Sequence, residues 1–445
     1  MARGKKKEEL SLEEKLEQAL VPVEEQPYEV PENWCWTRLE QVNEITMGQS
    51  PSGTDVTDDA NYTPLIGGAS DMGELYPIVS RYTKVPTKLS KKDDLIVCIR
   101  ATLGRPVYSD GEYCLGRGVA GIRASCCGKE YLRYFFMVFE QYLYDNATGT
   151  TFAQVTGKVL AKMPFPLPPL VEQQRIVEQI ESLFAKLNEA KEKVQFVRNC
   201  CDDNFSSSVH EAITGKLTEG WRIHNGISKS SWRKDKLGNL GSLERGRSKH
   251  RPRNDPRLFG GPHPFIQTGD VVEADIYIVK HKQTLSEFGL SQSRMFPKGT
   301  LCITIAANIG DVAILSYDCC FPDSVVGFTP CKGVESKYVY YMMSELQKEI
   351  EANAPATAQK NINLKILNDI DITIPSVIEQ KKIVEILDSL FDKKRQVQER
   401  AEQIVDTIDM MKKAILSKAF RGELGTNNPK EESSIELLKK ILMEA

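Results

Sequence analysis

The chain has 445 residues, more than one ordinary domain holds, so two or three domains are expected. Hydrophobic residues (41%) and charged residues (27%) are typical of a soluble globular protein, and the lack of an apolar run of about 18 residues excludes a membrane span. The formal net charge of −3 excludes a uniformly basic surface, so any nucleic-acid-binding face must be local.

The eleven cysteines indicate the redox compartment. The basic N-terminal residues lack the apolar core of a signal peptide, and no C-x-x-C pair indicates zinc. Adjacent cysteines are too close for ordinary disulfides, and they occur at Cys126–Cys127, Cys200–Cys201 and Cys319–Cys320. We therefore expect reduced thiols in a cytoplasmic protein.

In chain order, residues 1–31 predict an N-terminal extension and a helix. Residues 32–168 consist of short apolar runs separated by Gly, Pro, Asp and Ser, which predict strands and turns, with one helix at 129–143. Residues 169–217 predict a long helix from about 172 to 213. Its apolar residues recur near a spacing of 3.5 and its other faces are charged, as in a coiled coil.

The same order of elements then returns. After a linker at 218–231, residues 232–375 predict a second β-rich domain with one helix at 336–350. Residues 376–421 predict a second long helix, and residues 422–445 a tail helix. At 1.5 Å per residue, a helix of roughly 40 residues is about 60 Å long, and two of them favour an antiparallel pair that acts as a spacer. A helical hairpin without a special role is the alternative.

An internal repeat underlies this order. Residues 171–184 read VEQQRIVEQIESLF and residues 378–391 read IEQKKIVEILDSLF, with eight of fourteen positions identical. The match extends through most of the chain, pairing residues 95–104 with 301–310, 48–50 with 246–248, and Trp34 with Trp232. Residues 8–13 also resemble residues 431–436, so the helix before the first copy follows the second. The expected fold class is α+β, with two pseudo-symmetric β-rich domains, two long antiparallel coiled-coil helices and circularly arranged halves.

Motifs for catalysis are absent from the sequence. Residues 116–121 satisfy G-x-G-x-x-G, but the second copy, PDSVVG at 322–327, keeps only the last glycine, so we expect a turn between strands. No phosphate-binding G-x-x-x-x-G-K-[ST] loop and no Asn/Asp-Pro-Pro-Tyr/Phe tetrapeptide of adenine methyltransferases occurs. The five histidines have no metal-type spacing. We therefore predict no catalytic, cofactor-binding or metal-binding residues in this chain.

A basic segment is the strongest candidate for DNA binding. Residues 244–257 hold six arginines and lysines against two acids. Arginine can donate two hydrogen bonds to guanine, and both residue types neutralise phosphates. The alternative is a solvated basic loop. The predicted DNA-binding residues here are Arg245, Arg247, Lys249, Arg251 and Arg253.

The corresponding loop of the first copy, at residues 48–54, is polar and uncharged. Different loops on one scaffold are what two different sequence readers would show. The candidates are Gln49, Ser50 and Ser52, with Arg100, Arg105 and Arg117 as compensating cations or ordinary surface charges.

A second pair of matching loops, at residues 148–154 and 355–361, carries small residues, amides and hydroxyls. Such residues suit close approach to DNA and equally suit a capped turn. The candidates are Thr151, Gln154, Gln359, Lys360 and Asn361, to which we add Gln267, Thr268 and Asn308 of the second β-rich domain.

These features resemble the specificity subunit of type I restriction–modification systems. Each β-rich half is closed by a helix that begins Pro-x-x-x-Glu-Gln-x-x-Ile-Val, at residues 168–177 and 375–384, and Gly-Lys-Leu and Gly-Glu-Leu follow the two helices. Gln359-Lys360-Asn361-Ile362 is similar to the family's loop before the last strand, whereas the first copy departs there with residues 152–155.

The resemblance implies a non-catalytic, DNA-binding subunit. Each target-recognition domain would read one half of a split site in double-stranded DNA, and the helices would set the gap. The implied partners are two methyltransferase subunits that use S-adenosylmethionine, and motor/nuclease subunits that use ATP and Mg²⁺, with no membrane partner. The predicted partner-binding residues are Glu172, Gln173, Glu379 and Gln380. The alternatives are a self-contained DNA-modifying enzyme and a coiled-coil adaptor that does not bind DNA.

Overall fold

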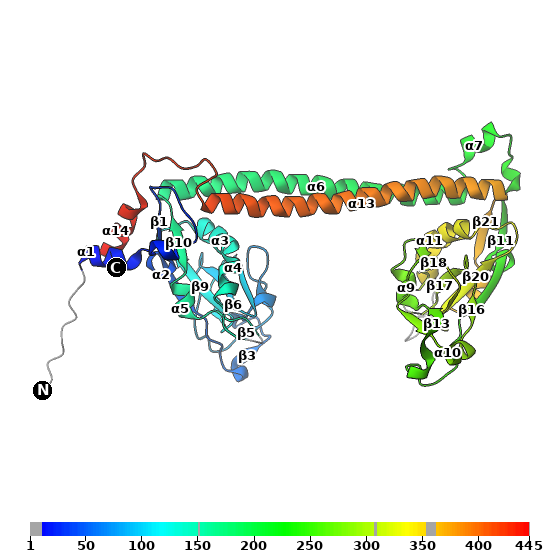
Figure 1. Ribbon diagram of the computed structural model, residues 1–445, viewed down its shortest axis with the longest axis horizontal. Coiled ribbons are helices and arrows are strands. Elements are labelled where there is room, and N and C mark those ends of the chain that lie inside the picture. Colours follow the sequence, from blue (N-terminus) through cyan, green and yellow to red (C-terminus); the bar gives the residue numbers. More distant parts are fainter. Residues whose placement is uncertain (1–10, 150–151, 307–308, 353–361, 445) are drawn as a thin grey trace. The chain divides into compact units, whose positions relative to one another are not determined.

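The computed structural model describes residues 11–149, 152–306, 309–352 and 362–444 (Figure 1). The chain forms two compact units: unit 1 is Met1–Lys193 with Ile404–Ala445, and unit 2 is Val194–Gln403. Each unit contains one β-rich body, the beginning of one long helix and the end of the other.

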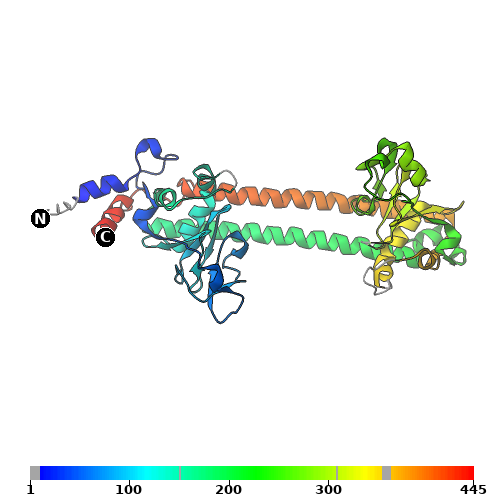
Figure 2. The same ribbon diagram turned by 90° about the horizontal axis from the view of Figure 1, so that it is seen from below.

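The two long helices are α6 (Leu170–Thr214) and α13 (Val377–Phe420), which confirms the predicted pair (Figure 2). In unit 1, Lys412 Nζ donates to Asn188 Oδ1 (2.6 Å) and Lys191 pairs with Asp409 (3.7 Å). Residue numbers thus rise along one helix as they fall along the other, so the helices are antiparallel.

The same antiparallel packing is present in unit 2. Gln398 Nε2 donates to Asp202 Oδ1 (3.1 Å), and the rings of Phe205 and Phe391 meet edge to face at 5.7 Å. Three residues with coiled-coil spacing, Val197, Ile404 and Met411, are exposed. A pair of helices buries only the stripe where they touch, so part of each apolar face remains outside it.

Each long helix ends at the glycine of the repeated Gly-Lys-Leu or Gly-Glu-Leu motif. Gly215 has φ of 75° and Gly422 has φ of 73°, in the left-handed region that only glycine adopts without strain. The repeated motif is therefore a helix stop.

In its described residues, the β-rich body of unit 1 contains three small sheets. The first is an antiparallel pair of strands that are distant in the sequence, β1 (Cys35–Arg38) and β10 (Pro164–Leu167). One four-stranded sheet has the order β2-β9-β6-β7, with β2 at Asn43–Met47, β6 at Leu95–Arg100, β7 at Thr102–Tyr108 and β9 at Val119–Ala124. The other has the order β3-β5-β4-β8, with β3 at Val56–Thr57, β4 at Thr63–Ile66, β5 at Tyr82–Thr83 and β8 at Cys114–Leu115.

The helices of this unit lie around those sheets. They are α1 (Leu12–Ala19), α2 (Leu39–Val42), α3 (Lys129–Val138), α4 (Glu140–Asp145), α5 (Gly157–Ala161) and α14 (Ser434–Glu444). The single helix predicted at 129–143 is wrong in one respect: it breaks at Phe139, whose ψ of 19° leaves the α-helical range, into α3 and α4.

The body of unit 2 repeats this plan. β11 (Arg233–Lys236) pairs with β21 (Asp371–Ile374), as β1 pairs with β10. One sheet has the order β12-β20-β17-β18-β14, with β12 at Gly241–Arg245, β14 at Tyr277–Ile278, β17 at Leu301–Thr304, β18 at Val312–Leu315 and β20 at Val325–Pro330. The other has the order β15-β13-β19-β16, with β13 at Phe259–Phe265, β15 at Gln283–Leu285, β16 at Met295–Phe296 and β19 at Cys319–Cys320.

Its helices are α7 (Glu219–His224), α8 (Leu237–Leu240), α9 (Thr268–Val272), α10 (Glu287–Gln292), α11 (Ser336–Ala352) and α12 (Leu364–Asn368). Helix α7 lies within residues 218–231, which were predicted as a plain linker. The order β2-β9-β6-β7 returns as β12-β20-β17-β18, with β14 added, and β5-β4-β8 returns as β15-β13-β19. The two bodies are thus pseudo-symmetric in these shared strands, whereas β3 and β16 belong to one body each.

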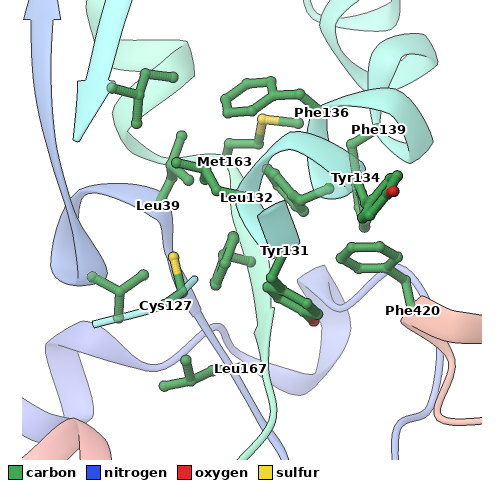
Figure 3. Close-up of a cluster of buried hydrophobic side chains, with 14 of the residues drawn as sticks. Leu39, Cys127, Tyr131, Leu132, Tyr134, Phe136, Phe139, Met163, Leu167 and Phe420 are labelled. Carbon is green, nitrogen blue, oxygen red and sulfur yellow. The ribbon is translucent and has the colours of Figure 1, made fainter. Parts of the chain in front are cut away.

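The core of unit 1 shows why the halves are circularly arranged. Tyr131 of α3 stacks on Phe420 from the last turn of α13, with ring centroids 4.8 Å apart, and both side chains are buried (Figure 3). In unit 2 the core instead includes Val209 and Ala212 from the end of α6. Each body is thus completed by the end of a helix that the other copy begins.

The two chain ends meet in unit 1. α14 packs against α1 and α2, and Lys15 Nζ of α1 donates to the carbonyl of Leu442 (3.4 Å). The helix after the second copy therefore lies beside the helix before the first, as the similarity of residues 8–13 and 431–436 predicts.

All eleven cysteines lie in the described part of the chain and carry free thiols. Among the described residues, no helix combines the length and apolar character that crossing a membrane requires.

Candidate nucleic-acid interface

Three predicted residues of unit 1 lie at one edge of the β2-β9-β6-β7 sheet. Arg100 ends β6, and an isolated β-bridge pairs it with Gln154. The Ile99 amide donates to the carbonyl of Gly118 (2.9 Å), which brings the turn that carries Arg117 to the same edge. The backbone of three separate segments, which carry Arg100, Arg117 and Gln154, thus meets at this edge.

The loop after β2 joins this edge. The amide of Arg117 donates to Ser50 Oγ (3.2 Å), and Thr87 Oγ1 donates to the carbonyl of Gln49. Ser52 lies farther along the same loop, exposed, with its Oγ 2.9 Å from Thr54 Oγ1. We call Gln49, Ser50, Arg100, Arg117 and Gln154 the unit 1 edge.

Glycine is required beneath this edge because backbones cross there. A Cβ on Gly48 would lie 2.1 Å from the carbonyl oxygen of Gly116, and a Cβ on Gly118 would lie 2.2 Å from that of Gly67. The G-x-G-x-x-G pattern therefore forms a packed turn between β8 and β9, as predicted, and not the start of a dinucleotide-binding helix.

Arg105 does not join the unit 1 edge. It has an unusual positive φ of 50°, and its guanidinium faces the carbonyls of Ala69 (3.4 Å) and Met72 (3.5 Å). It lines a separate cavity together with Arg133 and Lys412. The contacts of Arg105 therefore differ from those of Arg100 and Arg117.

In unit 2, a cavity of about 190 Å³ gathers part of the basic segment. Arg247, Arg253 and Gln267 line it, above apolar side chains that include Leu258 and Phe265. A hydrogen bond from the Arg247 amide to the carbonyl of Phe321 (3.2 Å) anchors the loop at the sheet. A polar rim over an apolar floor is the arrangement expected of a recognition pocket.

The other cations of this segment have different surroundings. Arg251 Nη1 donates to the carbonyls of Ser248 (2.6 Å) and His250 (2.9 Å), so it stabilises its own loop. Lys249 is held through its backbone, whose amide donates to the carbonyl of Gln292 (3.1 Å). The Arg257 guanidinium beside Asp255, helped by His250, holds the pKa of that carboxyl well below its usual range.

One acid moderates the positive charge. Arg253 pairs with the Asp323 carboxylate (3.0 Å), and Arg245 Nε donates to the carbonyl of the same residue. Within the described residues, the side chains of Arg247 and Lys249 have no ion-pair partner. Asp323 occupies the repeat position of Arg117, so the two copies place opposite charges at the same point of one scaffold.

The other predicted DNA-binding residues either lie near the start of α9 or fall outside the described residues. Thr268 begins α9, and Gln267 Nε2 donates to Gln283 Oε1 (2.8 Å). The predicted residues Thr151, Asn308, Gln359, Lys360 and Asn361 lie outside the described residues. Among the residues that the structure does describe, no group of His, Cys, Asp and Glu side chains is arranged to hold a metal ion.

The residues predicted to bind partners are internal. Glu172 and Glu379 have no exposed surface, and Gln173 and Gln380 are almost completely buried. Both glutamines hold the helix start, because Gln173 Nε2 donates to the carbonyl of Pro168 (3.1 Å) and Gln380 Nε2 to that of Pro375 (2.9 Å). The prediction of direct partner contact is therefore wrong, since tertiary packing covers these side chains.

Each buried glutamate ties the start of its long helix to distant segments through hydrogen bonds, an arrangement that we call a clamp. In unit 1, Glu172 accepts hydrogen bonds from Trp34 Nε1 (2.8 Å) and Asn427 Nδ2 (3.0 Å). Burial raises the pKa of the Glu172 carboxyl, and these two hydrogen bonds oppose the rise. Arg175 and Glu431 form an adjacent ion pair at 2.8 Å, which ties the C-terminal tail to the same helix start.

In unit 2, the equivalent clamp contains a buried ion pair. Glu379 accepts from Trp232 Nε1 (2.9 Å) and Thr218 Oγ1 (2.6 Å), and it pairs with Arg222 Nη1 (2.6 Å). Arg222 is buried, and its Nη2 also donates to the carbonyl of Gly215 (2.6 Å). The predicted linker thus supplies half of a buried ion pair, which no motif in the sequence indicates.

Comparisons with known proteins agree with this fold. The sequence profile of the family described as type I restriction modification DNA specificity domain matches residues 31–195 and 229–404. The specificity subunit of the type I restriction enzyme EcoBI of Escherichia coli is 22% identical, over 93% of this chain and 93% of its own length. That of EcoKI, from Escherichia coli strain K12, is 24% identical over 93% and 96%.

A putative specificity subunit, MjaX of Methanocaldococcus jannaschii, is 31% identical over a shorter stretch. The match covers 35% of this chain and 37% of that subunit.

Two solved structures share the fold. A chain from a study of complex assembly and conformational transition of the type I R-M system aligns with a TM-score of 0.69 at 21% identity, covering 89% of this chain and all of that one. The HsdS subunit from Thermoanaerobacter tengcongensis aligns with a TM-score of 0.53, also at 21% identity, over 90% and 100%. With two matched segments that together span more than half of the sequence, the chain belongs to the family of type I restriction modification DNA specificity domains.

Proposed function

We propose that this chain is the sequence-specific DNA-binding specificity subunit of a type I restriction–modification complex. Each β-rich body reads one half of a bipartite site in double-stranded DNA. One observation carries the proposal: the same scaffold, built twice, presents different polar groups at its equivalent edge. Gln49 and Arg117 stand in unit 1 where Arg247 and Asp323 stand in unit 2.

The polar side chains of the unit 1 edge and of the unit 2 cavity are of the kinds that bind DNA. Guanidinium and amide groups can donate in pairs to base edges, and cations neutralise phosphates. Family membership and the absence of catalytic motifs from the sequence support a chain that directs catalysis without performing it. Methylation would then be carried out by two partner methyltransferase subunits that bind S-adenosylmethionine. Restriction would need motor/nuclease subunits that use ATP and Mg²⁺.

In this proposal, the helix pair sets the spacer between the two half-sites. The long helices belong to both units and begin directly after β10 and β21, the last strands of the two bodies. A continuous helix has a rise of 1.5 Å per residue and resists bending, so its length is suited to measure distance along DNA.

Replacing residues 232–375 with the segment of a relative that reads another sequence should change one half-site only. The exchange joins at the short β11–β21 pair and leaves unit 1 and both long helices intact. Methylation mapping of DNA from a host carrying the complete system checks this. The other half-site and the spacer should stay unchanged, and a change in both half-sites would contradict modular reading.

The partner-docking surface is better assigned to exposed residues beside the buried Glu-Gln motifs. Leu170 and Val171 are exposed at the start of α6, and their repeat counterparts Val377 and Ile378 are exposed at the start of α13. Glu178 and its counterpart Glu385 continue the same helix face. An exposed apolar face that is kept in both copies, while the DNA-facing loops differ, fits two copies of one partner, the methyltransferase subunit.

Val171→Asp and Ile378→Asp should each remove one methyltransferase copy from the complex, since a carboxylate cannot be buried cheaply in an apolar contact. Native mass spectrometry of the assembled complex measures the stoichiometry. Val23→Asp is the matched control, because Val23 is 81% exposed and lies outside the repeated helix. Two bound copies in both variants would exclude this docking face.

A further inference from the structure

A buried carboxylate lies beside the unit 1 edge and holds an arginine that the sequence analysis did not select. Asp71 ends the short helix η3 (Ala69–Asp71) and is 2% exposed. Its Oδ2 accepts hydrogen bonds from the amides of Gly67 (2.6 Å) and Gly68 (3.3 Å) and from Arg81 Nη2 (3.1 Å). These three bonds leave the carboxylate one orientation, so Asp71 is a rigid support.

Arg81 differs from its support in being accessible. Its side chain is 48% exposed, and a single hydrogen bond from one Nη connects its guanidinium to Asp71 among the described residues. A guanidinium has five N–H donors in a fixed plane. The hydrogen bond to Asp71 therefore orients one side of the guanidinium plane, and the remaining N–H donors can face a ligand.

The guanidinium lies next to the unit 1 edge. A Cβ on Gly67 would be 2.6 Å from Arg81 Nη2, so the group rests directly over that glycine. A Cβ on Gly116 would be 3.2 Å from Gly67 Cα and 3.7 Å from Ser50 Oγ. The backbones of Gly67 and Gly116 thus lie between Arg81 and Ser50, and neither glycine has a side chain of its own.

Arg123, in the same unit, forms an ion pair that is purely structural. Arg123 binds the buried Asp94 through Nε (2.9 Å) and Nη2 (3.0 Å), and its Nη1 binds Glu44 (2.8 Å). All three nitrogens of that guanidinium are used within the protein. Arg81 donates to the protein through one nitrogen, Nη2, so its other N–H groups can donate to a ligand.

The second copy places a different group at the same point. The parallel pairings Leu65 with Cys114 and Phe265 with Cys320 make Gly67 and Gln267 equivalent. There too a carboxylate supports the turn, because Asp270 Oδ2 accepts from the Gln267 amide (2.8 Å). The support is shared, whereas the outward group is a guanidinium in unit 1 and a carboxamide in unit 2, as expected where two half-sites differ.

We infer that Arg81 reads a guanine of the half-site bound by unit 1, in the major groove, and that Asp71 is the positioning residue that aims it. This inference rests on the proposed function and deepens it. Arginine donates two parallel hydrogen bonds to guanine O6 and N7, and a carboxylate behind the guanidinium limits the directions in which it can do so.

The experiment uses the complete chain co-assembled with its methyltransferase subunit, and a DNA library in which both half-sites are randomised. Arg81→Gln should lower discrimination for guanine at one position of the unit 1 half-site by about tenfold or more, with the unit 2 half-site read as before. Arg81→Lys should not restore it, because an ammonium is a point charge without the planar fork. Arg123→Gln, the matched control, should change no base preference.

Asp71→Asn supplies the test of positioning. It should weaken preference at the same base position as Arg81→Gln, and combining the two should add little. An equal loss of affinity for all sequences with a smaller salt dependence would make Arg81 a phosphate contact and overturn the inference, as would unchanged base preference. If the wild-type complex shows no split-site preference, the proposed function itself fails. Intact reading of the unit 2 half-site shows that a variant is folded and assembled.

Discussion

Arg222→Met is expected to destabilise unit 2 by about 3–5 kcal/mol. The substitution leaves the fully buried Glu379 carboxylate without its cation, at a position that water does not reach. It also removes the donor to the carbonyl of Gly215, where α6 ends. Thermal unfolding combined with hydrogen exchange at the start of α13 measures the loss.

A second substitution separates the ion pair from its surroundings. In the double variant Arg222→Met/Glu379→Met both charges are gone, and much of the lost stability should return, because an uncompensated buried charge is the main cost. Lys216→Met removes an exposed partner of Glu211 in the same segment and should leave unfolding unchanged. A double variant as unstable as Arg222→Met would contradict the buried-charge explanation.

Leu438→Ala is expected to destabilise unit 1 by about 2–5 kcal/mol, although the residue lies in the last helix of the chain. Leu438 is fully buried in the unit 1 core, where α14 packs against α1 and α2. Loss of α14 packing also weakens the tail that supplies Asn427 to Glu172. Hydrogen exchange in both units checks the effect, and protection in unit 2 should not change.

Met443→Ala is the matched control for this prediction. Met443 lies in the same helix and is 65% exposed, so its truncation should change the free energy of unfolding little. If Leu438→Ala were as harmless as Met443→Ala, the chain ends would not be part of the unit 1 core.

The burial of the two Glu-Gln motifs could not be predicted from the sequence. Their repetition was visible, and charged residues on a helix normally face solvent. Their burial depends on Trp34, 138 residues from Glu172, and on Trp232, 147 residues from Glu379. No local pattern reveals a contact of that separation, so the sequence alone predicts a partner surface where the structure has buried residues that hold the helix starts.

The candidate DNA interface was predicted in part. Chemistry alone suggests Gln49, Ser50, Arg100, Arg117 and Gln154 as candidates, and a β-bridge and loop hydrogen bonds bring them to one edge. Arg105 has the same chemistry, but its guanidinium contacts the carbonyls of Ala69 and Met72. No sequence pattern singles out Arg81. Its candidate role follows from its hydrogen bond to Asp71 and from the glycine backbone beneath its guanidinium, which only the structure shows.

The sequence by itself determined the doubled plan, the two long helices, their glycine stops and the circular order of the halves, because these depend on periodicity, glycine geometry and repeat spacing. Tertiary structure alone decided which polar residues are buried, which residues meet at one edge of a sheet and which arginine is oriented by a buried carboxylate. These properties arise from contacts between segments that are far apart in the sequence, such as Trp34 with Glu172, and local sequence patterns do not contain that information.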